Sequence, residues 1–226
     1  MRIAVIVPVY NRAASIEKSL RALALLRRRG HRVIVVDGGS TDDTVRRACG
    51  LADRVLQAPR GWSHQINAGA RAPEVEGVDA LVFLPEDVRL PPDAERMFAR
   101  ALANAHSPWG RFDVHLVSTR GAAAARLAEA MGNLGARVTG IGTREQVLFI
   151  TRGAFLALEG FAGDDAHAIA DFCRRAGLFG PPIPMRARTQ FRVADCSAVP
   201  LLLRALRREA ARVATALGYD RPIPGL

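Results

Sequence analysis

Residues Ile3-Ala4-Val5-Ile6-Val7 form an unbroken apolar run near the start of the chain, and four of the five are β-branched. A short run of this kind without polar alternation is typical of a parallel strand covered by helices on both faces. Residues 14–29 follow with apolar side chains at helical spacing and end in the cationic turn Arg27-Arg28-Arg29 before a glycine. A second β-branched run, Val33–Val36, comes next. The sequence therefore predicts a β-α-β unit and, with it, a parallel sheet.

The same alternation continues through the first half of the chain. The further elements predicted there are a short helix that opens with the capping-box-like Ser40–Asp43 and runs toward Cys49, a weak strand at Val55-Leu56, a helix over 63–71, a strand over Ala80–Leu84 and a helix from Pro92 to about Ala103. The second half is less regular. Its predicted elements are a strand over Phe112–Val117 that alternates like an antiparallel one, a helix over Ala122–Leu134, a strand over Gln146–Thr151, a helix over 166–175 and a basic amphipathic helix over Val199–Leu217. An α/β fold with a mainly parallel sheet flanked by helices accounts for this order.

The composition indicates one soluble globular domain and excludes several classes of protein. With 226 residues, 49% of them hydrophobic and 24% charged, the chain can bury a sizeable core and is neither disordered nor collagen-like. Its three cysteines are odd in number and lack C-x-x-C spacing, which argues against a disulfide framework or a zinc site and favours a reducing cytoplasm. No apolar run approaches the ~20 residues that a membrane-spanning helix needs.

The formal net charge is +10, and Lys18 is the one lysine among the 32 basic residues. Arginine binds phosphate oxygens in a bidentate manner, so this charge favours an anionic substrate or an anionic membrane surface. The arginines are spread along the whole chain and are not interleaved with aromatic residues, which make up only 6% of the sequence. This distribution argues against nucleic-acid binding.

The residues that directly follow the predicted strands are candidates for a binding site. In an open parallel sheet, ligands bind outside the carboxyl ends of the strands, where these residues converge. They are Pro8-Val9-Tyr10-Asn11 after the first strand, Asp37-Gly38-Gly39-Ser40 after the second and Pro85-Glu86-Asp87 after the strand over 80–84. The first segment lacks the glycines of a dinucleotide fingerprint, and the chain has no G-x-x-x-x-G-K-[ST] loop, which argues against a dehydrogenase and a P-loop NTPase.

These segments resemble the nucleotide-sugar domain of family 2 glycosyltransferases, which have the GT-A fold. The likeness is carried by Val7–Asn11, by Val35–Asp42 and by the strand end at Asp87. Three further segments are similar to a bacterial subgroup named after neighbouring radical-SAM and selenium-related domains. They are residues 59–70, 109–114 and 139–146.

The resemblance covers residues 1 to about 177 and implies a single GT-A-like domain over residues 1–226. Within it, residues 1–104 are expected to bind the nucleotide sugar and residues 105–198 to form the acceptor and catalytic half, followed by the amphipathic helix over 199–217. The implied activity is the transfer of a sugar from a nucleotide diphosphate sugar, a UDP-sugar being the first expectation, to an unidentified hydroxyl acceptor.

The resemblance also implies roles for two strand-end carboxylates. Asp37 is expected to accept hydrogen bonds from a uracil or a ribose, and the alternative is that it caps the turn after it. Asp87 is expected to hold Mg²⁺ or Mn²⁺ against the diphosphate, because hard cations prefer oxygen ligands, and the alternative is a first-turn carboxylate. The family's metal motif has an acidic residue or a histidine two positions earlier, where this chain has Pro85. Glu86 is adjacent to Asp87 and on an extended segment points the opposite way, so the sequence leaves metal dependence open.

The residues that the motifs place around the donor are Pro8, Tyr10, Asn11, Arg60, Asn67, Glu86, Glu145 and Gln146. Arg60 is expected to bind the diphosphate by charge, and Asn67 is expected to line the pocket unless it is an amide on a helix surface. Glu145 and Gln146 fall where the subgroup has an acidic residue followed by glutamine, which would face the donor sugar. An ordinary pair at the entry of a strand is the alternative.

An acidic pair supplies the candidate general base. Inverting members of the family use a carboxylate, just before an arginine-rich helix, to deprotonate the acceptor hydroxyl. Here Asp164 and Asp165 precede a helix that ends in Arg174-Arg175. Counting back from Gly177 favours Asp165, and Asp164 stays a candidate. A helix N-cap with one more carboxylate in the first turn explains the pair equally well.

A second hypothesis is a degenerate GT-A domain that binds nucleotides, or lies on a membrane, without turnover. Pro85 motivates the loss of catalysis, and the basic amphipathic helix over 199–217 motivates peripheral contact with an anionic membrane. The more common role of such a helix is to dock on its own core. The donor sugar, the acceptor and the oligomeric state are left open.

Overall fold

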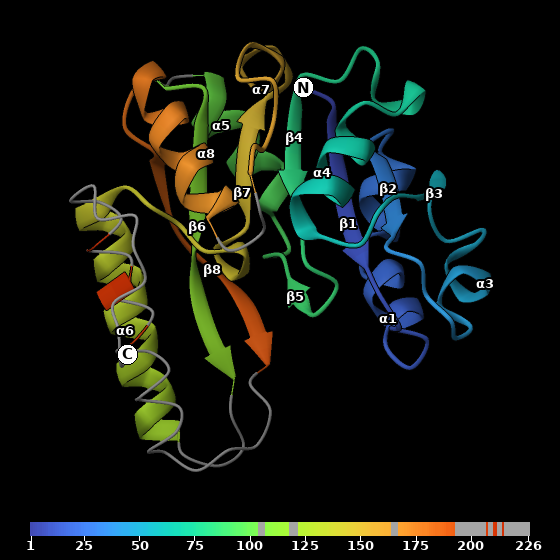
Figure 1. Ribbon diagram of the computed structural model, residues 1–226, viewed down its shortest axis with the longest axis horizontal. Helices are drawn as coiled ribbons and strands as arrows, with labels where there is room; N and C mark the ends of the chain where they lie inside the picture. Colours follow the sequence, from blue (N-terminus) through green and yellow to red (C-terminus); the bar gives the residue numbers. More distant parts are fainter. Residues whose placement is uncertain are drawn as a thin grey trace.

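The computed structural model describes residues 1–103, 107–117, 122–163 and 167–192, together with the single positions 207, 210, 211 and 214. In this part of the chain, eight strands form one mixed sheet in the order β3-β2-β1-β4-β7-β6-β8-β5 (Figure 1). The strands β3, β2, β1 and β4 are parallel, and β6 is parallel to β8. The strand β7 is antiparallel to β4 and β6, and β5 is antiparallel to β8. The predicted α/β fold with a mostly parallel sheet is confirmed.

The strands are β1 (Ile3–Val9), β2 (Arg32–Asp37), β3 (Arg54–Gln57), β4 (Ala80–Phe83), β5 (Val88–Arg89), β6 (Trp109–Val117), β7 (Leu148–Thr151) and β8 (Ile183–Arg192). The α-helices described are α1 (Ile16–Arg21), α2 (Ala24–Arg28), α3 (Thr44–Ala48), α4 (Trp62–Ala70), α5 (Ala94–Ala103), α6 (Ala122–Thr139), α7 (Arg152–Ala157) and α8 (Ala168–Ala176). Short 3-10 helices are η1 (Pro73–Val75), η2 (Arg144–Gln146) and η3 (Gly177–Phe179). Among these helices, none combines the length and the apolar character needed to cross a membrane.

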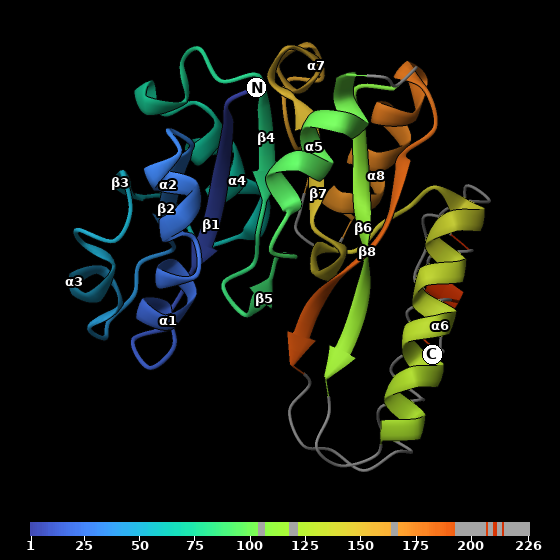
Figure 2. The same cartoon turned by 180° about the vertical axis from the view of Figure 1, so that it is seen from behind.

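Helices cover both faces of the sheet. The helices α4, α7 and α8 lie on the face seen in Figure 1, and α1, α2 and α5 lie on the opposite face, seen in Figure 2. On the first face, Ile6 and Val36 pack with Ile66 of α4, and on the second, Val5 and Val35 pack with Leu20 of α1. Every residue of β1 is buried, so the apolar run that opens the sequence is the covered central strand it predicts.

Gly69 sets the distance between α4 and the sheet. A Cβ atom at this position would lie 2.5 Å from Cγ2 of Ile6 and 2.9 Å from Cγ2 of Val36. These atoms belong to two fully buried side chains, which cannot move away from the helix. Glycine therefore allows α4 to rest directly on β1 and β2.

The helix α6 covers an edge of β6 by side-chain hydrogen bonds. Asn133 accepts from the N–H of Val114 at 3.0 Å and donates to its carbonyl at 3.0 Å, as a neighbouring strand would. Glu129 accepts from the N–H of Leu116 at 3.2 Å. These bonds satisfy backbone groups that would otherwise be open to pairing with another chain.

Two predictions about the first helices are wrong in detail. Residues 14–29 do not form one helix, because α1 and α2 are separated at Ala22-Leu23. Ser40 does not cap α3, because its hydroxyl donates to Asp37 Oδ1 and accepts from the N–H of Asn11. The N–H of Thr44 donates to Asp42 Oδ1 at 3.0 Å instead.

The second half of the sheet also differs from the prediction. Residues 112–117 pair in parallel with β8, a strand that the sequence analysis did not identify, and β6 is antiparallel to β7 only over Trp109–Arg111. The register of β6 on β8 shifts between Phe112 and Asp113, and the alternation within residues 112–117 does not show that the partner strand is parallel. The predicted helix over Val199–Leu217 lies largely outside the described residues.

The close approach of Gly69 to the sheet predicts that adding a side chain at this position lowers the stability of the protein. Gly69→Ala should lower the free energy of unfolding by about 1–3 kcal/mol, because the added methyl group overpacks the core. The matched control is Gly153→Ala, on the exposed start of α7, where a Cβ atom meets nothing within 4 Å. This control should be neutral or stabilising by up to ~1 kcal/mol. Urea denaturation measures both variants, and equal effects would contradict the role of Gly69.

Candidate active site

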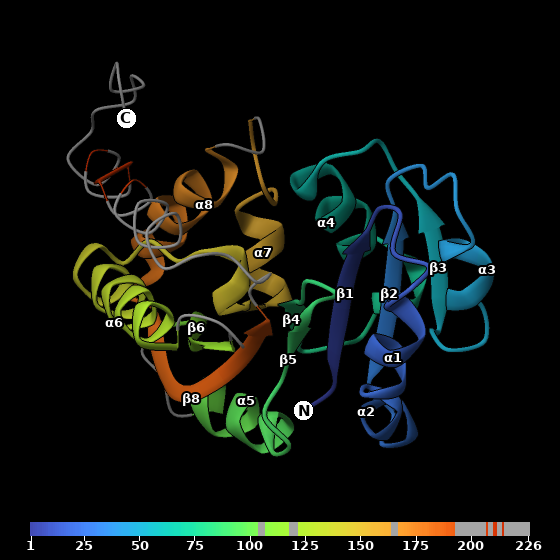
Figure 3. The ribbon, with the colours of Figure 1, turned by 90° about the horizontal axis from the view of Figure 1, so that it is seen from below.

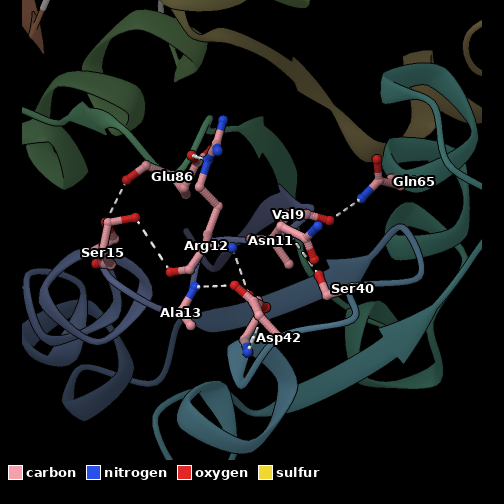
Figure 4. A network of polar contacts seen from close by, with 11 residues as sticks. Val9, Asn11, Arg12, Ala13, Ser15, Ser40, Asp42, Gln65 and Glu86 are labelled. Atoms are coloured by element: carbon pink, nitrogen blue, oxygen red, sulfur yellow. Dashed lines mark hydrogen bonds and ion pairs between the residues drawn. The ribbon is translucent and has the colours of Figure 1, made fainter. Parts of the chain in front are cut away.

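A cleft of about 550 Å³ opens at the carboxyl ends of β1 and β4. These ends lie at the lower edge of the sheet in Figure 1, and Figure 4 shows the polar contacts around them. The residues that line the cleft are Pro8, Val9, Tyr10, Asn11, Arg12, Arg60, Gly61, Trp62, Gln65, Pro85, Glu86, Asp87, Arg144, Glu145 and Phe191. The strand-end segments after β1 and β4 therefore converge on one site, as the parallel sheet predicts.

The loop after β1 is locked to the loop after β2. Asn11 has a left-handed φ of 51°, a conformation that asparagine tolerates better than most residues. Its Oδ1 atom accepts from the N–H of Thr41 at 2.9 Å, and its own N–H donates to Ser40 Oγ at 2.8 Å. Next to it, the N–H of Ala13 donates to Asp42 at 3.1 Å (Figure 4). These bonds fix the backbone that carries Tyr10 and Asn11 into the cleft.

Asp37 supports this arrangement from inside the protein. Its side chain is fully buried and does not line the cleft. Its Oδ2 atom accepts from the N–H groups of Gly39 at 3.1 Å and Ser40 at 2.9 Å, and Oδ1 accepts from the Ser40 hydroxyl. The geometry is that of a carboxylate capping the following turn, the alternative to the predicted contact with a uracil or ribose.

Gln65 joins α4 to two strand ends. Its Nε2 atom donates to the carbonyl of Val9 at 2.9 Å (Figure 4) and to the carbonyl of Val36 at 2.7 Å. The side chain is buried at the wall of the cleft. Gly38 is packed against it, since a Cβ atom there would lie 3.2 Å from Nε2. Gln65 lies in the 59–70 segment that carries the family resemblance, and no role for it was predicted. A glutamine on the apolar face of a predicted helix needs a hydrogen-bond partner inside the protein. This pattern in the sequence could have indicated a structural role for Gln65.

Three arginines and three carboxylates line the same cleft. Arg12 donates from Nε to Glu86, and Arg144 lies 3.5 Å from Glu145, measured from Nε to Oε1. Arg60 stands over the ring of Tyr10, with Cζ 3.9 Å from the ring centroid, as in a cation–π contact. Within the described part of the chain, Arg60 has no carboxylate partner, so its charge is available to an anion.

Of the three carboxylates that line the cleft, Asp87 is the one without an arginine partner among the described residues. Its side chain is exposed to solvent at the cleft. Partial burial and, after it, the neighbouring charges of Glu86 and Glu145 raise the pKa of Asp87 to about 6. Arg12 acts in the opposite direction, but less strongly. A carboxyl group held in this way favours the approach of a cation.

The cleft brings together most of the predicted site residues. Those that line it are Pro8, Tyr10, Asn11, Arg60, Glu86, Asp87 and Glu145. Arg12, Gln65 and Arg144 line it as well, although the sequence analysis gave them no role. The candidate bases Asp164 and Asp165 lie outside the described residues.

Asn67 and Gln146 are not in the lining of the cleft. The Asn67 amide accepts from the N–H of Phe161 at 3.0 Å and donates to its carbonyl at 2.8 Å. Gln146 is buried, accepts from the N–H of Thr143 at 3.1 Å and donates to Asn133 at 3.2 Å. Both amides are engaged within the protein, Asn67 with the backbone of Phe161 and Gln146 with Thr143 and Asn133, so neither is placed at the donor cleft as the motifs predicted.

The described residues contain no group of three or more His, Cys, Asp or Glu side chains placed to hold a metal ion. Mg²⁺ is usually bound by one or two carboxylates together with substrate phosphates, and not by a cage of protein ligands. Asp87, with its raised pKa, fits the part of the single protein carboxylate.

Comparison with known proteins identifies the fold and the family. No curated protein matches the chain. The structure is similar to glucosyl-3-phosphoglycerate synthase from Mycobacterium tuberculosis in complex with Mn²⁺, uridine diphosphate and glucosyl-3-phosphoglycerate, at 22% identity and a TM-score of 0.60, covering 100% of this chain and 82% of that one.

Two further structures have the same fold. A mannosyltransferase from Pyrobaculum calidifontis in complex with GDP-mannose and Mn²⁺ is 20% identical, with a TM-score of 0.67 over 99% of this chain and 66% of that one. Residues 1–349 of S. aureus TarS in complex with UDP-GlcNAc are 18% identical, with a TM-score of 0.64 over 98% of this chain and 68% of that one. At this level of identity, the likeness establishes the GT-A fold.

The family follows from the sequence match. The profile of glycosyl transferase family 2 matches residues 4–159, which include β1, the cleft and Glu145. The match covers well over half of the chain, so the protein belongs to glycosyl transferase family 2 and is a glycosyltransferase that uses a nucleotide-sugar donor.

Proposed function

We propose that the protein transfers a sugar from a nucleotide diphosphate sugar, first of all a UDP-sugar, to a hydroxyl acceptor with inversion at the anomeric carbon. The observation that carries the proposal is the cleft at the ends of β1 and β4, where Arg12, Arg60 and Arg144 meet Asp87. Arginine side chains at one mouth suit the oxygens of a diphosphate. The similar structures from M. tuberculosis and S. aureus carry UDP and UDP-GlcNAc, which supports the choice of donor.

Asp87 is the residue that would hold a divalent cation, together with the oxygens of the donor diphosphate. A bound Mg²⁺ or Mn²⁺ would neutralise charge on the departing nucleoside diphosphate. Pro85 lies in the lining beside Asp87 and offers no ligand, and Glu86 is engaged by Arg12. Two of the similar structures contain Mn²⁺, which supports a metal in this role.

The transfer itself is a single displacement. The acceptor oxygen forms a bond to the anomeric carbon while the bond from that carbon to the diphosphate oxygen breaks. The diphosphate leaves with the electron pair, and the acceptor proton passes to a carboxylate, for which Asp165, or Asp164 beside it, is the proposed base.

The two halves of the domain are proposed to bind different substrates, the donor in residues 1–104 and the acceptor in residues 105–198. The likeness to the bacterial subgroup with radical-SAM and selenium-related neighbours stays a prediction.

Donor binding should depend on Asp87 and on a divalent cation together. UDP with Mn²⁺ should raise the melting temperature of the wild-type protein, and Asp87→Asn should lose the part of the shift that Mn²⁺ adds. Asp93→Asn is the matched control, because Asp93 is an exposed carboxylate outside the cleft. An unchanged Mn²⁺-dependent shift in Asp87→Asn would refute the assignment of Asp87.

Turnover separates the transferase from a degenerate nucleotide-binding domain. Hydrolysis of UDP-sugars should fall at least about tenfold in Asp87→Ala and in Asp165→Ala, since each loses a charged group at the reacting centre. Nucleotide binding with no turnover by the wild-type protein would support the degenerate domain instead.

The raised pKa of Asp87 predicts how stability without ligand depends on pH. The Asp87 carboxyl binds its proton more tightly in the folded protein than in the unfolded chain. The protonated carboxyl therefore contributes to the stability of the fold below pH ~4, and this contribution is lost as the pH rises through about 6. Asp87→Asn removes the charge and should be more stable than the wild type at pH 7.5, by about 1 kcal/mol after solvent screening, and equally stable at pH 4. Thermal unfolding at the two pH values, with Asp93→Asn as control, measures the effect. A difference of the same size at both pH values would contradict it.

A further inference from the structure

The short helix η2 forms the wall of the cleft that faces Asp87. Arg144 and Glu145 line the cleft from this element, and the charge of Glu145 contributes to the raised pKa of Asp87. The Glu145 side chain is 10% exposed, and among the described residues the partner of its carboxylate is Arg144, at 3.5 Å. A carboxylate can accept about four hydrogen bonds, so Glu145 has acceptor positions left for a ligand.

The backbone leaves η2 in a strained conformation. Val147, the residue after η2, has a φ of 47° and a ψ of 93°, and its side chain is fully buried. A positive φ is a genuine outlier for a β-branched residue. Such a conformation persists only where the surrounding structure holds it, and it occurs preferentially at functional sites. The contacts around η2 therefore hold the turn against this strain.

A buried amide holds one side of η2. Gln146 accepts from the N–H of Thr143 at 3.1 Å and donates to Asn133 of α6 at 3.2 Å. Asn133 is in turn bonded to both backbone groups of Val114 in β6. Gln146 and Asn133 are buried and do not line the cleft, so they tie η2 to α6 and β6 from inside the protein.

A buried hydroxyl holds the other side of η2. Thr189 belongs to β8, which runs to the centre of the molecule, where its carboxyl-terminal end pairs with β5 (Figure 3). The Thr189 side chain is fully buried, and its hydroxyl lies 3.0 Å from the carbonyl oxygen of Glu145 and 3.3 Å from that of Asp113. A hydroxyl has one proton to donate, and the shorter distance favours Glu145 as the acceptor.

We propose that Thr189 is a positioning residue for recognition of the donor sugar: its hydroxyl holds the backbone of Glu145, so that the Glu145 carboxylate accepts hydrogen bonds from hydroxyl groups of that sugar. The inference rests on the proposed transferase function, in which the donor diphosphate lies beside Asp87 and the attached sugar lies near Glu145. Thr189 is buried outside the lining of the cleft. It therefore acts on the sugar through Glu145, and it does not act on the nucleotide.

The contribution of the sugar to donor affinity tests this role. With Mn²⁺ present, the dissociation constant of UDP divided by that of a UDP-sugar isolates this contribution, and we call this quotient the sugar ratio. Thr189→Val removes the hydroxyl, keeps the shape of the side chain and should lower the sugar ratio about fivefold, the change expected for one hydrogen bond. The affinity for UDP itself should not change. Calorimetric titration with UDP, UDP-glucose and UDP-GlcNAc measures the effect, and the ratio is taken for the sugar that the wild type binds more tightly.

Two control variants separate the hydroxyl from packing and from stability. Thr189→Ser keeps the hydroxyl, loses one methyl group and should retain the wild-type sugar ratio. Thr151→Val removes a hydroxyl from the N-cap of α7, outside the cleft, and should lower the melting temperature without changing the ratio. A ratio that falls equally in Thr189→Val and Thr189→Ser, or that also falls in Thr151→Val, would overturn the inference.

A double-mutant cycle shows whether Thr189 acts through Glu145. Glu145→Ala removes the carboxylate and should lower the sugar ratio at least as much as Thr189→Val does. Adding Thr189→Val to Glu145→Ala should then lower the ratio no further, because the side chain that Thr189 positions is already absent. Effects of the two substitutions that multiply in the double variant would show that Thr189 acts independently of Glu145, contrary to the proposal.

UDP binding separates this inference from the function on which it rests. If UDP binds with Mn²⁺ and the sugar ratio of Thr189→Val equals that of the wild type, the role of Thr189 is refuted and the proposed transferase function stands. If the wild-type protein binds neither UDP nor either UDP-sugar, the proposed donor and the role of Thr189 are refuted together.

Discussion

The burial of both faces of the central strands is the constraint on which the site depends. All residues of β1 and all but the first of β2 are buried, and helices cover each face of the sheet. A polar side chain in the middle of such a strand would lose its hydration without compensation, so polar groups are confined to the strand ends. Parallel strands end at the same edge, and this edge is where Arg12 meets Glu86 although 74 positions separate them in the chain.

The charges at this edge explain why the cleft is prepared for a ligand. Glu86, Asp87 and Glu145 would repel one another, and arginines pair with the first and the third. Asp87 is left with a raised pKa, so the ligand-free site is less stable than it could be. Under the proposed function, a cation together with a diphosphate would relieve that repulsion, and the diphosphate would pair with Arg60, which has no carboxylate partner among the described residues.

Local patterns predicted the first half of the fold well, because β1, β2 and β4 are short apolar runs whose burial is visible in their composition. The strand-end pattern also placed Asp87 at the cleft, whereas Glu145 was placed there by the family resemblance. The strand β8 was not predicted, because its pairing with β6 is parallel and shifts register at Asp113, which is a property of two distant segments. Arg12 was missed for a similar reason: its partner Glu86 lies in a loop 74 positions away in the chain.

Asn67 shows how the two halves of the molecule are joined. Its amide makes two hydrogen bonds to the backbone of Phe161, and Arg175 of α8 donates to carbonyls in the same 158–161 segment. This segment is therefore held by side chains from both halves at once. The helix that carries Asn67 also carries Gln65 into the wall of the donor cleft. Through α4, the wall of the donor cleft is therefore connected by direct hydrogen bonds to residues 158–161 of the second half.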